Sequence, residues 1–377
     1  MLLDCVFILG FSNRFPSTQK MPITLKDIAT KVGVSRQAVA AALSLSGSGK
    51  VSAELRAKIQ QVAAEMDYVP NQTARRLKGI STKTIGLYGA PFVAEITQSY
   101  FNMLSEELYK CGYDLLTSYG FTEQTAQHAL RAMIMKGVDG VIITTQDNPL
   151  AKMKDVKTPY IYCPVTPADS FDIAIDHRNG TYNAAKTIIN LGRRRLAYIS
   201  NAPGQMPNVS PTIEKLAGLA QAAEEAGVEF CHFSTVDTKG NSQLLVSRIL
   251  DFGTDAVFCC NDYYAARLEH ALLASGIRIP EDMMLVGYDG LAFCDLCPVP
   301  LSTIIQPMRQ FAKESANLIL EKIQGTSINR PANRKLLQPY FYQSSSCGKR
   351  NAFLDTMPLR NSFPTLEYMW EQERRQC

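Results

Sequence analysis

The chain is poor in the residues that enzymes commonly use for chemistry. Among its 377 residues there is one tryptophan, and there are only four histidines, at positions 128, 177, 232 and 270. No Ser/His/Asp grouping, phosphate-binding loop or convincing cluster of metal ligands appears along the sequence. His177 follows Asp176, but this pair is more typical of a turn than of a catalytic dyad. We therefore expect no catalysis, no metal ion and no cofactor.

Long hydrophobic runs are also missing. The apolar stretch from Cys5 to Phe11 is far below the roughly 20 residues that a membrane-spanning helix needs. No basic region precedes this stretch, and no convincing cleavage site follows it. Because Met21 stands just before the first regular pattern, we predict that translation starts there and that residues 1–20 are a non-native extension. A peptide of the native protein from before residue 21 would disprove this prediction.

The cysteines are numerous but not arranged in pairs. The ten cysteines are scattered and mostly lie in apolar runs, as do Cys163, Cys231, Cys259 and Cys260. Residues 294–297 form one C-x-x-C, but no second pair with zinc-finger spacing accompanies it. Its position favours an ordinary loop over a redox or metal site. We expect reduced, buried thiols of the kind found in cytoplasmic proteins.

Positive charge is concentrated near the start of the chain. The whole sequence has 39 basic and 35 acidic residues, a net charge of +4. Residues 21–79 hold nine bases and four acids, 9 − 4 = +5, which leaves 4 − 5 = −1 for the remainder. A chain of this length has room for two or three domains. The first of them carries the charge that would meet phosphates.

The segment from Thr24 to Val39 has the spacing of a helix-turn-helix. Ala29 is small where two helices must touch, and Gly33 can adopt the positive φ that a tight turn needs. Val39 then packs the second helix onto the first. An ordinary helical packing unit without a DNA role is the alternative.

Polar residues support the boundaries of these helices. Thr24, with Asp27 three residues later, resembles a capping box. Ser35 can cap the second helix. Ser52 stands before a third amphipathic run and is its expected N-cap. The sequence therefore predicts three short helices between residues 24 and 66.

The next segment, residues 68–79, favours the DNA interpretation. It has a helix-initiating Pro70 and ends at Gly79, and it carries three cations within four residues, Arg75, Arg76 and Lys78. This arrangement resembles the hinge helix of the lactose-repressor/galactose-repressor (LacI/GalR) family of bacterial regulators. The resemblance extends from about residue 22 to residue 347.

The resemblance implies how the chain would contact DNA. The second helix would enter the major groove, where Arg can pair with a guanine edge and Gln with an adenine edge. Leu77 matches the leucine that the family wedges into a base step of the minor groove. Because one hinge helix cannot serve both half-sites, we expect a homodimer on a palindromic operator. The expected DNA-binding residues are Thr24, Ser35, Arg36, Gln37, Ala38, Ser52, Tyr68, Asn71, Ala74, Arg75 and Leu77.

From about residue 83 the pattern changes to short apolar strands that alternate with helices. Strands are expected near residues 84–88, 113–116, 140–144, 160–162, 196–200, 229–231, 256–260 and 284–288. The intervening helices are expected near residues 97–111, 123–136, 180–191, 211–226, 241–252 and 263–275. Such alternation predicts parallel sheets that are covered on both faces. Two such halves resemble the type I periplasmic-binding-protein fold that the family uses to sense effectors, and residues 300–307 resemble its return crossover.

The fold class expected is thus an all-α helix-turn-helix head with a hinge helix, plus an α/β periplasmic-binding-protein-like domain of two doubly wound subdomains. The domains expected are a non-native extension (1–20), the helix-turn-helix domain (21–69), the hinge and linker (70–82), the ligand-sensing domain (83–347) and a tail (348–377).

Ligands of open α/β sheets bind beyond the carboxyl ends of the strands. Asn261 and Asp289 both follow strands, and an amide and a carboxylate can grip neighbouring sugar hydroxyls. The resemblance places effector contacts at these two positions and at Lys215, where the family usually has Arg. Asp176 is a further candidate, although a strand-end Asp often only caps a helix. Residues 94–97 replace the family's aromatic wall, so the effector is not expected to be a common hexose.

The resemblance implies a cytoplasmic, nucleoid-associated regulator, most simply a repressor, that binds a small effector related to sugars. A sugar-binding protein of a transporter is the alternative, since it shares the large fold. Such a protein would need an export signal and no DNA-binding head, and this sequence shows the reverse. Whether the effector is an inducer or a corepressor stays open.

Overall fold

A computed structural model describes residues 23–43, 51–68, 81–89, 95–120, 122–154, 156–164, 166–168, 170–200, 211–326 and 334–349. The chain divides into two compact units, Met1–Ile80 and Ser81–Cys377. They are called the head and the large unit below. The predicted extension, most of the predicted hinge and nearly all of the tail lie outside the described residues.

The head contains the three helices that the sequence predicts. They are α1 (Leu25–Val32), α2 (Arg36–Leu43) and α3 (Ala53–Glu65). Gly33 ends α1 with a φ of +78°, the left-handed conformation expected of the tight turn. Ile28, Val39 and Ile59 are fully buried and contribute one side chain from each helix to a common core. Arg56 of α3 donates a hydrogen bond to the carbonyl oxygen of Ala42 over 2.8 Å and ties the last turn of α2 to α3.

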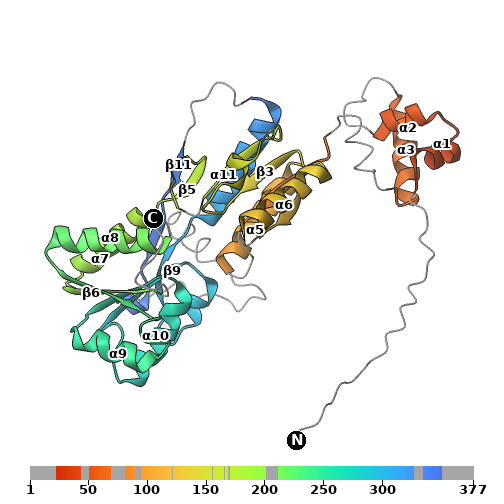
Figure 1. The fold of residues 1–377 in the computed structure, drawn as a ribbon. Helices are drawn as coiled ribbons and strands as arrows, with labels where there is room; N and C mark the ends of the chain where they lie inside the picture. The colour runs from red at the N-terminus through yellow and green to blue at the C-terminus, as the bar shows by residue number, and fades with distance from the viewer. Residues whose placement is uncertain are drawn as a thin grey trace, which may run out of the picture. The chain divides into compact units, whose positions relative to one another are not determined.

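The large unit has two lobes, each built on a parallel sheet with helices on both faces (Figure 1). Lobe 1 has strands in the order β2-β1-β3-β4. Its elements in chain order are β1 (Thr84–Tyr88), α5 (Glu95–Lys110), β2 (Asp114–Ser118), α6 (Glu123–Lys136), β3 (Gly140–Ile143), η1 (Pro149–Lys152), β4 (Tyr160–Tyr162) and, later in the chain, α11 (Met308–Gln324). One face of this sheet packs against α5 and α11, and the other packs against α6.

Lobe 2 has a sheet in the order β12-β10-β9-β8-β6-β7, with only β12 antiparallel to its neighbour. Its elements are α7 (His177–Asn190), β6 (Arg195–Ser200), α8 (Pro211–Ala226), β7 (Glu229–Ser234), α9 (Ser242–Asp251), β8 (Ala256–Cys259), α10 (Asp262–Ala274), β9 (Met284–Asp289), η2 (Ala292–Leu296), β10 (Ser302–Ile305), β12 (Tyr340–Tyr342) and η3 (Ser345–Cys347). Helices α7 and α8 cover one face, and α9 and α10 cover the other (Figure 1). The inner strands β6, β8 and β9 are almost entirely buried, which explains their largely apolar sequences.

Three connections join the lobes. The chain enters lobe 2 after β5 (Ile173–Ile175), returns to lobe 1 between β10 and α11, and crosses again between β11 (Lys335–Leu337) and β12. Strands β5 and β11 pair in parallel as a small separate sheet. The crossover predicted at residues 300–307 corresponds to the second connection. The sequence analysis did not predict β5, β11, β12 or the helix α11. Shortness alone does not explain the missed strands, because β4 also has three residues and was predicted.

The cysteine prediction is correct in most positions that the structure describes. The eight cysteines within this part are all free, and Cys163, Cys259 and Cys260 are buried as expected. Cys231 is only partly buried, because it lies on the edge strand β7, so that expectation was wrong. The segment with the C-x-x-C is not an irregular loop but mostly the 3-10 helix η2.

Two further features follow from the described residues. None of their helices combines the length and the apolar character that crossing a membrane requires. No group of three or more His, Cys, Asp or Glu side chains among them is arranged to hold a metal ion.

Candidate DNA-binding head and effector site

The start of α2 presents two long polar side chains to solvent. Arg36 and Gln37 are the first two helical residues, and both are exposed. Ala38 is half-buried, because it lies closer to the core formed with Val39. Ser35 accepts a hydrogen bond from the backbone nitrogen of Ala38 over 3.1 Å, which fixes the first turn. The two side chains are therefore held on a rigid helix end and remain accessible.

The other head residues predicted to contact DNA also have structural partners. Ser52 caps α3 by accepting from the backbone nitrogen of Leu55. The Asp27 carboxylate accepts from both the backbone nitrogen and the hydroxyl of Thr24, which lowers the pKa of Asp27. Tyr68 packs partly against the head core. The hinge candidates Asn71, Ala74, Arg75 and Leu77 lie outside the described residues.

In the large unit, four polar side chains lie near the carboxyl ends of β8, β9 and β10, and two of them, Lys215 and Gln306, contact a third, Asp289. We call Lys215, Asn261, Asp289 and Gln306 the strand-end cluster. The sequence predicted the first three but not Gln306, which donates a hydrogen bond to Oδ1 of Asp289 over 2.7 Å. The only signal for Gln306 was its place at the end of the predicted crossover. The parallel register of β9 with β10 brings the two strand ends together.

Lys215 is the most deeply buried member of the strand-end cluster. Its residue is 5% exposed, and its ammonium donates to the carbonyl oxygen of Cys260 over 2.8 Å. The same nitrogen lies 3.5 Å from the ring centroid of Tyr288 and 4.0 Å from Oδ1 of Asp289. Burial lowers the pKa of Lys215, and the charge of Asp289 opposes that shift. The ammonium is thus stabilised by an aromatic face and a carbonyl as well as by a carboxylate.

Asp289 ends β9 in an unusual backbone conformation. Its φ is +119°, a value that L-residues rarely adopt, and its side chain is 12% exposed. Burial raises the pKa of this carboxyl, while Lys215 and Gln306 act in the opposite direction. Strained backbone of this kind commonly marks sites where side-chain direction matters for function. The strain directs a partly exposed carboxylate toward the end of the sheet.

Asn261 and Asp176 both act as helix caps. The Asn261 side chain accepts from the backbone nitrogen of Tyr264 over 3.0 Å at the start of α10. Asp176 accepts from the backbone nitrogen of Asn179 over 3.0 Å at the start of α7, and also from the Gln338 side chain. Asp176 therefore caps a helix, which the sequence analysis gave as the alternative to an effector contact. It lies where the chain passes from lobe 1 to lobe 2. It does not contact the strand-end cluster directly.

Asp262 was not predicted, yet it organises the loop after β9. It is fully buried, and its Oδ2 accepts from the backbone nitrogens of Gly290 and Leu291 over 2.9 and 2.8 Å. Its Oδ1 accepts from the Thr303 hydroxyl over 2.6 Å. Burial, followed by the nearby charge of Asp289, raises the pKa of Asp262 to about 7. The N-terminus of α10 and the loop that follows Asp289 are thereby joined.

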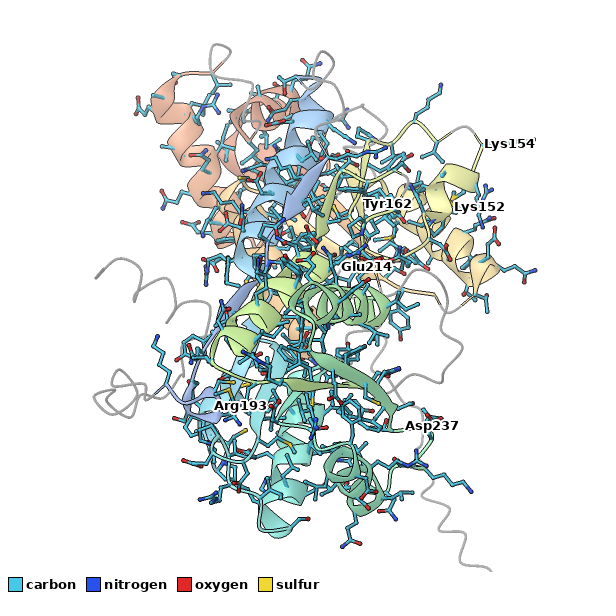
Figure 2. All side chains as sticks on the ribbon, turned by 90° about the vertical axis from the view of Figure 1, so that its left-hand side faces the viewer. Lys152, Lys154, Tyr162, Arg193, Glu214 and Asp237 are labelled. Atoms are coloured by element: carbon cyan, nitrogen blue, oxygen red, sulfur yellow. The ribbon has the colours of Figure 1, made fainter. Side chains whose placement is uncertain are left out.

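The orientation of lobe 2 is visible in Figure 2. Arg193, just before β6, and Asp237, just after β7, lie on opposite sides of lobe 2, so they mark the two ends of these strands. Glu214, the neighbour of Lys215 in α8, lies where lobe 2 adjoins lobe 1 (Figure 2).

Comparisons with known proteins agree with this architecture. Residues 24–71 match the model of the bacterial regulatory proteins of the lacI family, and residues 185–347 match a periplasmic binding protein-like domain. The head therefore carries a helix-turn-helix domain of the lacI family, and the large unit carries a periplasmic-binding-protein-like domain. The family resemblance and the fold class predicted from the sequence are confirmed.

Two transcriptional repressors align with this chain over most of their length. The ribose operon repressor of Haemophilus influenzae is 28% identical over 321 residues, which cover 81% of this chain and 93% of the repressor. The HTH-type transcriptional repressor PurR of Vibrio atlanticus is 28% identical over 319 residues, covering 80% of this chain and 92% of the relative. These relatives are transcriptional repressors and not enzymes, as the sequence led us to expect.

A solved structure shows the same fold. The lac repressor dimer bound to operator and the anti-inducer ONPF superposes with a TM-score of 0.73 at 21% identity. The match covers 86% of this chain and 99% of the lac repressor chain. This chain therefore has the fold of the lac repressor over 86% of its length. It is a DNA-binding regulator with a domain of the type that senses small molecules.

Proposed function

We propose that this protein is a cytoplasmic repressor that binds a palindromic operator as a homodimer and responds to a small effector. The observation that carries the DNA part is the start of α2. There Arg36 and Gln37 project from a capped helix in a head that matches the family's DNA-binding model. Both side chains can make two hydrogen bonds to a base edge in the major groove. A paired head would read two half-sites related by a dyad.

The hinge part of the proposal rests on sequence. Leu77 would wedge into a central base step of the minor groove, and Ala74 is small where two hinge helices would approach. Arg75 and Asn71 would contact the phosphate backbone of the DNA. Phosphate contacts from Thr24, Ser35, Ser52 and Tyr68 would set the register of the head. Such contacts position the protein but do not by themselves select a sequence.

The effector part of the proposal rests on the strand-end cluster. Asp289 and Asn261 offer an acceptor and an amide beyond neighbouring strands, and Lys215 and Gln306 hold the carboxylate in place. Carboxylates and amides of this kind suit a ligand rich in hydroxyl groups, such as a sugar or a sugar derivative. Asp176 would contribute by holding the start of α7. By linkage, effector and operator must change each other's affinity by the same factor.

Selection of bound DNA from a random library tests the operator proposal. The full chain and a version starting at Met21 are used at one fixed salt concentration, because phosphate contacts make affinity strongly salt-dependent. We expect an enriched palindrome with a pyrimidine–purine step at its centre, a step that is easily kinked. Selection is repeated with a panel of pentoses, hexoses and disaccharides. A library that shows no enrichment under any condition would overturn the proposal.

Asp289→Asn tests the effector proposal. The substitution keeps the size of the side chain but removes its charge, so one charge-assisted hydrogen bond to the effector is weakened. We expect affinity for the sugar that responds in the panel to fall by about 10- to 100-fold, since such a bond contributes roughly 1.5–3 kcal/mol. Titration calorimetry measures this. Operator binding without effector should change little.

The matched control for this prediction is Asp237→Asn. Asp237 lies on the same lobe and is exposed in the turn after β7, an edge strand separated from β8 by β6, so the same charge is removed at a distance of two strands from Asn261 (Figure 2). Sugar affinity should stay unchanged in this variant. Equal sugar affinity in Asp289→Asn and the unaltered protein would remove Asp289 from the site.

A further inference from the structure

Two side chains that are 168 positions apart in the chain meet between the lobes. The Tyr263 hydroxyl donates a hydrogen bond to Oε2 of Glu95 over 3.0 Å. Glu95 is the first residue of α5 in lobe 1, and Tyr263 is the second residue of α10 in lobe 2. Each helix follows a parallel strand of its own sheet, β1 and β8 respectively. The bond therefore joins the carboxyl-end edges of the two sheets.

The Tyr263 ring is held in position although it is 51% exposed. It packs against Phe293 with 4.9 Å between the ring centroids and an interplanar angle of 41°. Phe293 belongs to η2, which follows directly after Leu291, one of the residues that Asp262 holds by its backbone nitrogen. A tyrosine supported in this way presents its hydroxyl to Glu95 with little loss of side-chain freedom.

The same two segments carry the strand-end cluster. Tyr263 comes two residues after Asn261, and Phe293 comes four residues after Asp289. Asp262 lies between Asn261 and Tyr263 and bonds the loop between Asp289 and Phe293. A molecule that binds Asn261 and Asp289 can therefore move the start of α10, which holds Tyr263, and the loop that carries Phe293.

Other side-chain bonds between the lobes lie at the connecting segments. In the described part of the chain, Gln338 bonds both Asn179 and Asp176. Gln338 stands between β11 and β12, and Asp176 stands between β5 and α7, so both lie where the chain passes from one lobe to the other. These bonds can persist while the lobes rotate about the connections. The bond from Tyr263 to Glu95 joins two helix starts that are not themselves connecting segments, and it must break if these helix starts separate.

We propose that Tyr263 and Glu95 form a latch that holds the lobes in the arrangement of this structure, and that the effector acts by changing the strength of this latch. The second clause rests on the effector role proposed for Asn261 and Asp289. One exposed hydrogen bond is a small contribution, so its loss changes the free-energy difference between the two arrangements only modestly. That balance suits a switch, because a ligand shifts an equilibrium only by its differential affinity for the two states.

The latch is tested by measuring the distance between the lobes in the full chain, with neither DNA nor sugar present. Spin labels are introduced as non-canonical side chains at Lys136, the last residue of α6, and at Arg248 in α9, both of which are exposed. Labelled protein is diluted with unlabelled protein so that distances within one protomer dominate. Pulsed electron resonance then gives the populations of the lobe arrangements.

Tyr263→Phe keeps the ring on Phe293 and removes only the hydroxyl. We expect the population of the second arrangement to rise by about 2- to 10-fold relative to the first, as the loss of one hydrogen bond implies. Glu95→Ala should give the same populations as Tyr263→Phe, and the double variant should add nothing further. Tyr109→Phe is the matched control, because Tyr109 lies on α5 and is 78% exposed. It should leave the populations unchanged.

Two results would overturn the latch. One is an unchanged distance distribution in Tyr263→Phe, and the other is a double variant whose effect is the sum of the two single ones. If Tyr263→Phe does not fold, Glu95→Gln replaces it, since this change keeps the size of the side chain and weakens only the acceptor. Because the measurement uses no operator and no effector, its failure is distinct from a failed DNA selection.

Discussion

Arg36→Ala is expected to weaken binding to the selected operator by about 30- to 20 000-fold. A good side-chain contact to one base contributes roughly 1–3 kcal/mol, and a homodimer loses two such contacts, hence roughly 2–6 kcal/mol. Arg36 is exposed at the first position of α2, so its removal leaves the head core of Ile28, Val39 and Ile59 untouched. Binding isotherms on operator and on random DNA at one salt concentration measure the effect.

The contrast between the two DNAs identifies the role of Arg36. Random DNA should bind the variant only slightly less well, because that interaction depends mainly on overall charge. Lys58→Ala is the control: it removes the same charge from an exposed position of α3, away from α2. It should lower both affinities by the same small factor. Arg36→Lys should resemble Arg36→Ala on the operator, since a lysine lacks the planar fork. Equal losses of Arg36→Ala on operator and random DNA would exclude base reading.

Asp262→Ala is expected to lower the free energy of unfolding of the large unit by about 3–5 kcal/mol. The change deprives the backbone nitrogens of Gly290 and Leu291 and the Thr303 hydroxyl of their acceptor inside the protein. Buried donors left without partners are costly. Asp262→Asn should cost far less. Its carbonyl oxygen can replace Oδ2 for both nitrogens, and its amide can donate to Thr303. Urea unfolding of the three proteins measures these differences.

The unaltered protein and Asp262→Asn should also differ in how their stability depends on pH. Burial raises the pKa of Asp262 to about 7 in the folded protein, above the ordinary value of 3.8. Between these values the folded state binds more protons than the unfolded state, so this group destabilises the protein as pH rises. The penalty is absent below about pH 4 and complete above about pH 7. Between pH 5 and pH 8, Asp262 should lose up to about 3 kcal/mol relative to Asp262→Asn.

Urea midpoints of both proteins across that range provide the test. Parallel pH profiles for the unaltered protein and Asp262→Asn would show that the carboxyl remains ionised throughout. In that case the three donors around it, and not its burial, would dominate its titration.

Gly287 is a useful check on the packing, because a Cβ there would lie 2.1 Å from Oδ1 of Asp262. Even a single added methyl group would therefore displace this carboxylate.

Much of the head was predictable because its determinants are local. Ala29, Gly33 and Val39 stand within eleven positions of one another, and the turn that they imply is the one observed. The caps at Ser35 and Ser52 act on amides three residues away and were predicted as such. Short-range hydrogen bonds and helical spacing are contained in a short window of sequence. That is why a single sequence was enough for these features.

The network behind the strand-end cluster was not predictable in the same way. Asn261 and Asp289 could be named because each follows an apolar strand, and parallel strands end at one edge. Asp262 bonds Gly290, which lies 28 positions away in the chain. Tyr263 bonds Glu95, which lies 168 positions away. No periodicity in the sequence reports which polar groups will be buried together.

The sequence by itself determined the helix-turn-helix spacing, the alternation of strands and helices over most of the large unit, and the resemblance to a family of regulators. Only the tertiary structure decided that Lys215 lies under Tyr288, that Gln306 holds Asp289, and that a tyrosine and a glutamate meet between the lobes. The physical reason is the range of the interactions. Hydrophobic period and capping act between neighbours in the chain, whereas burial, charge pairing and pKa shifts depend on which distant segments the packing brings together.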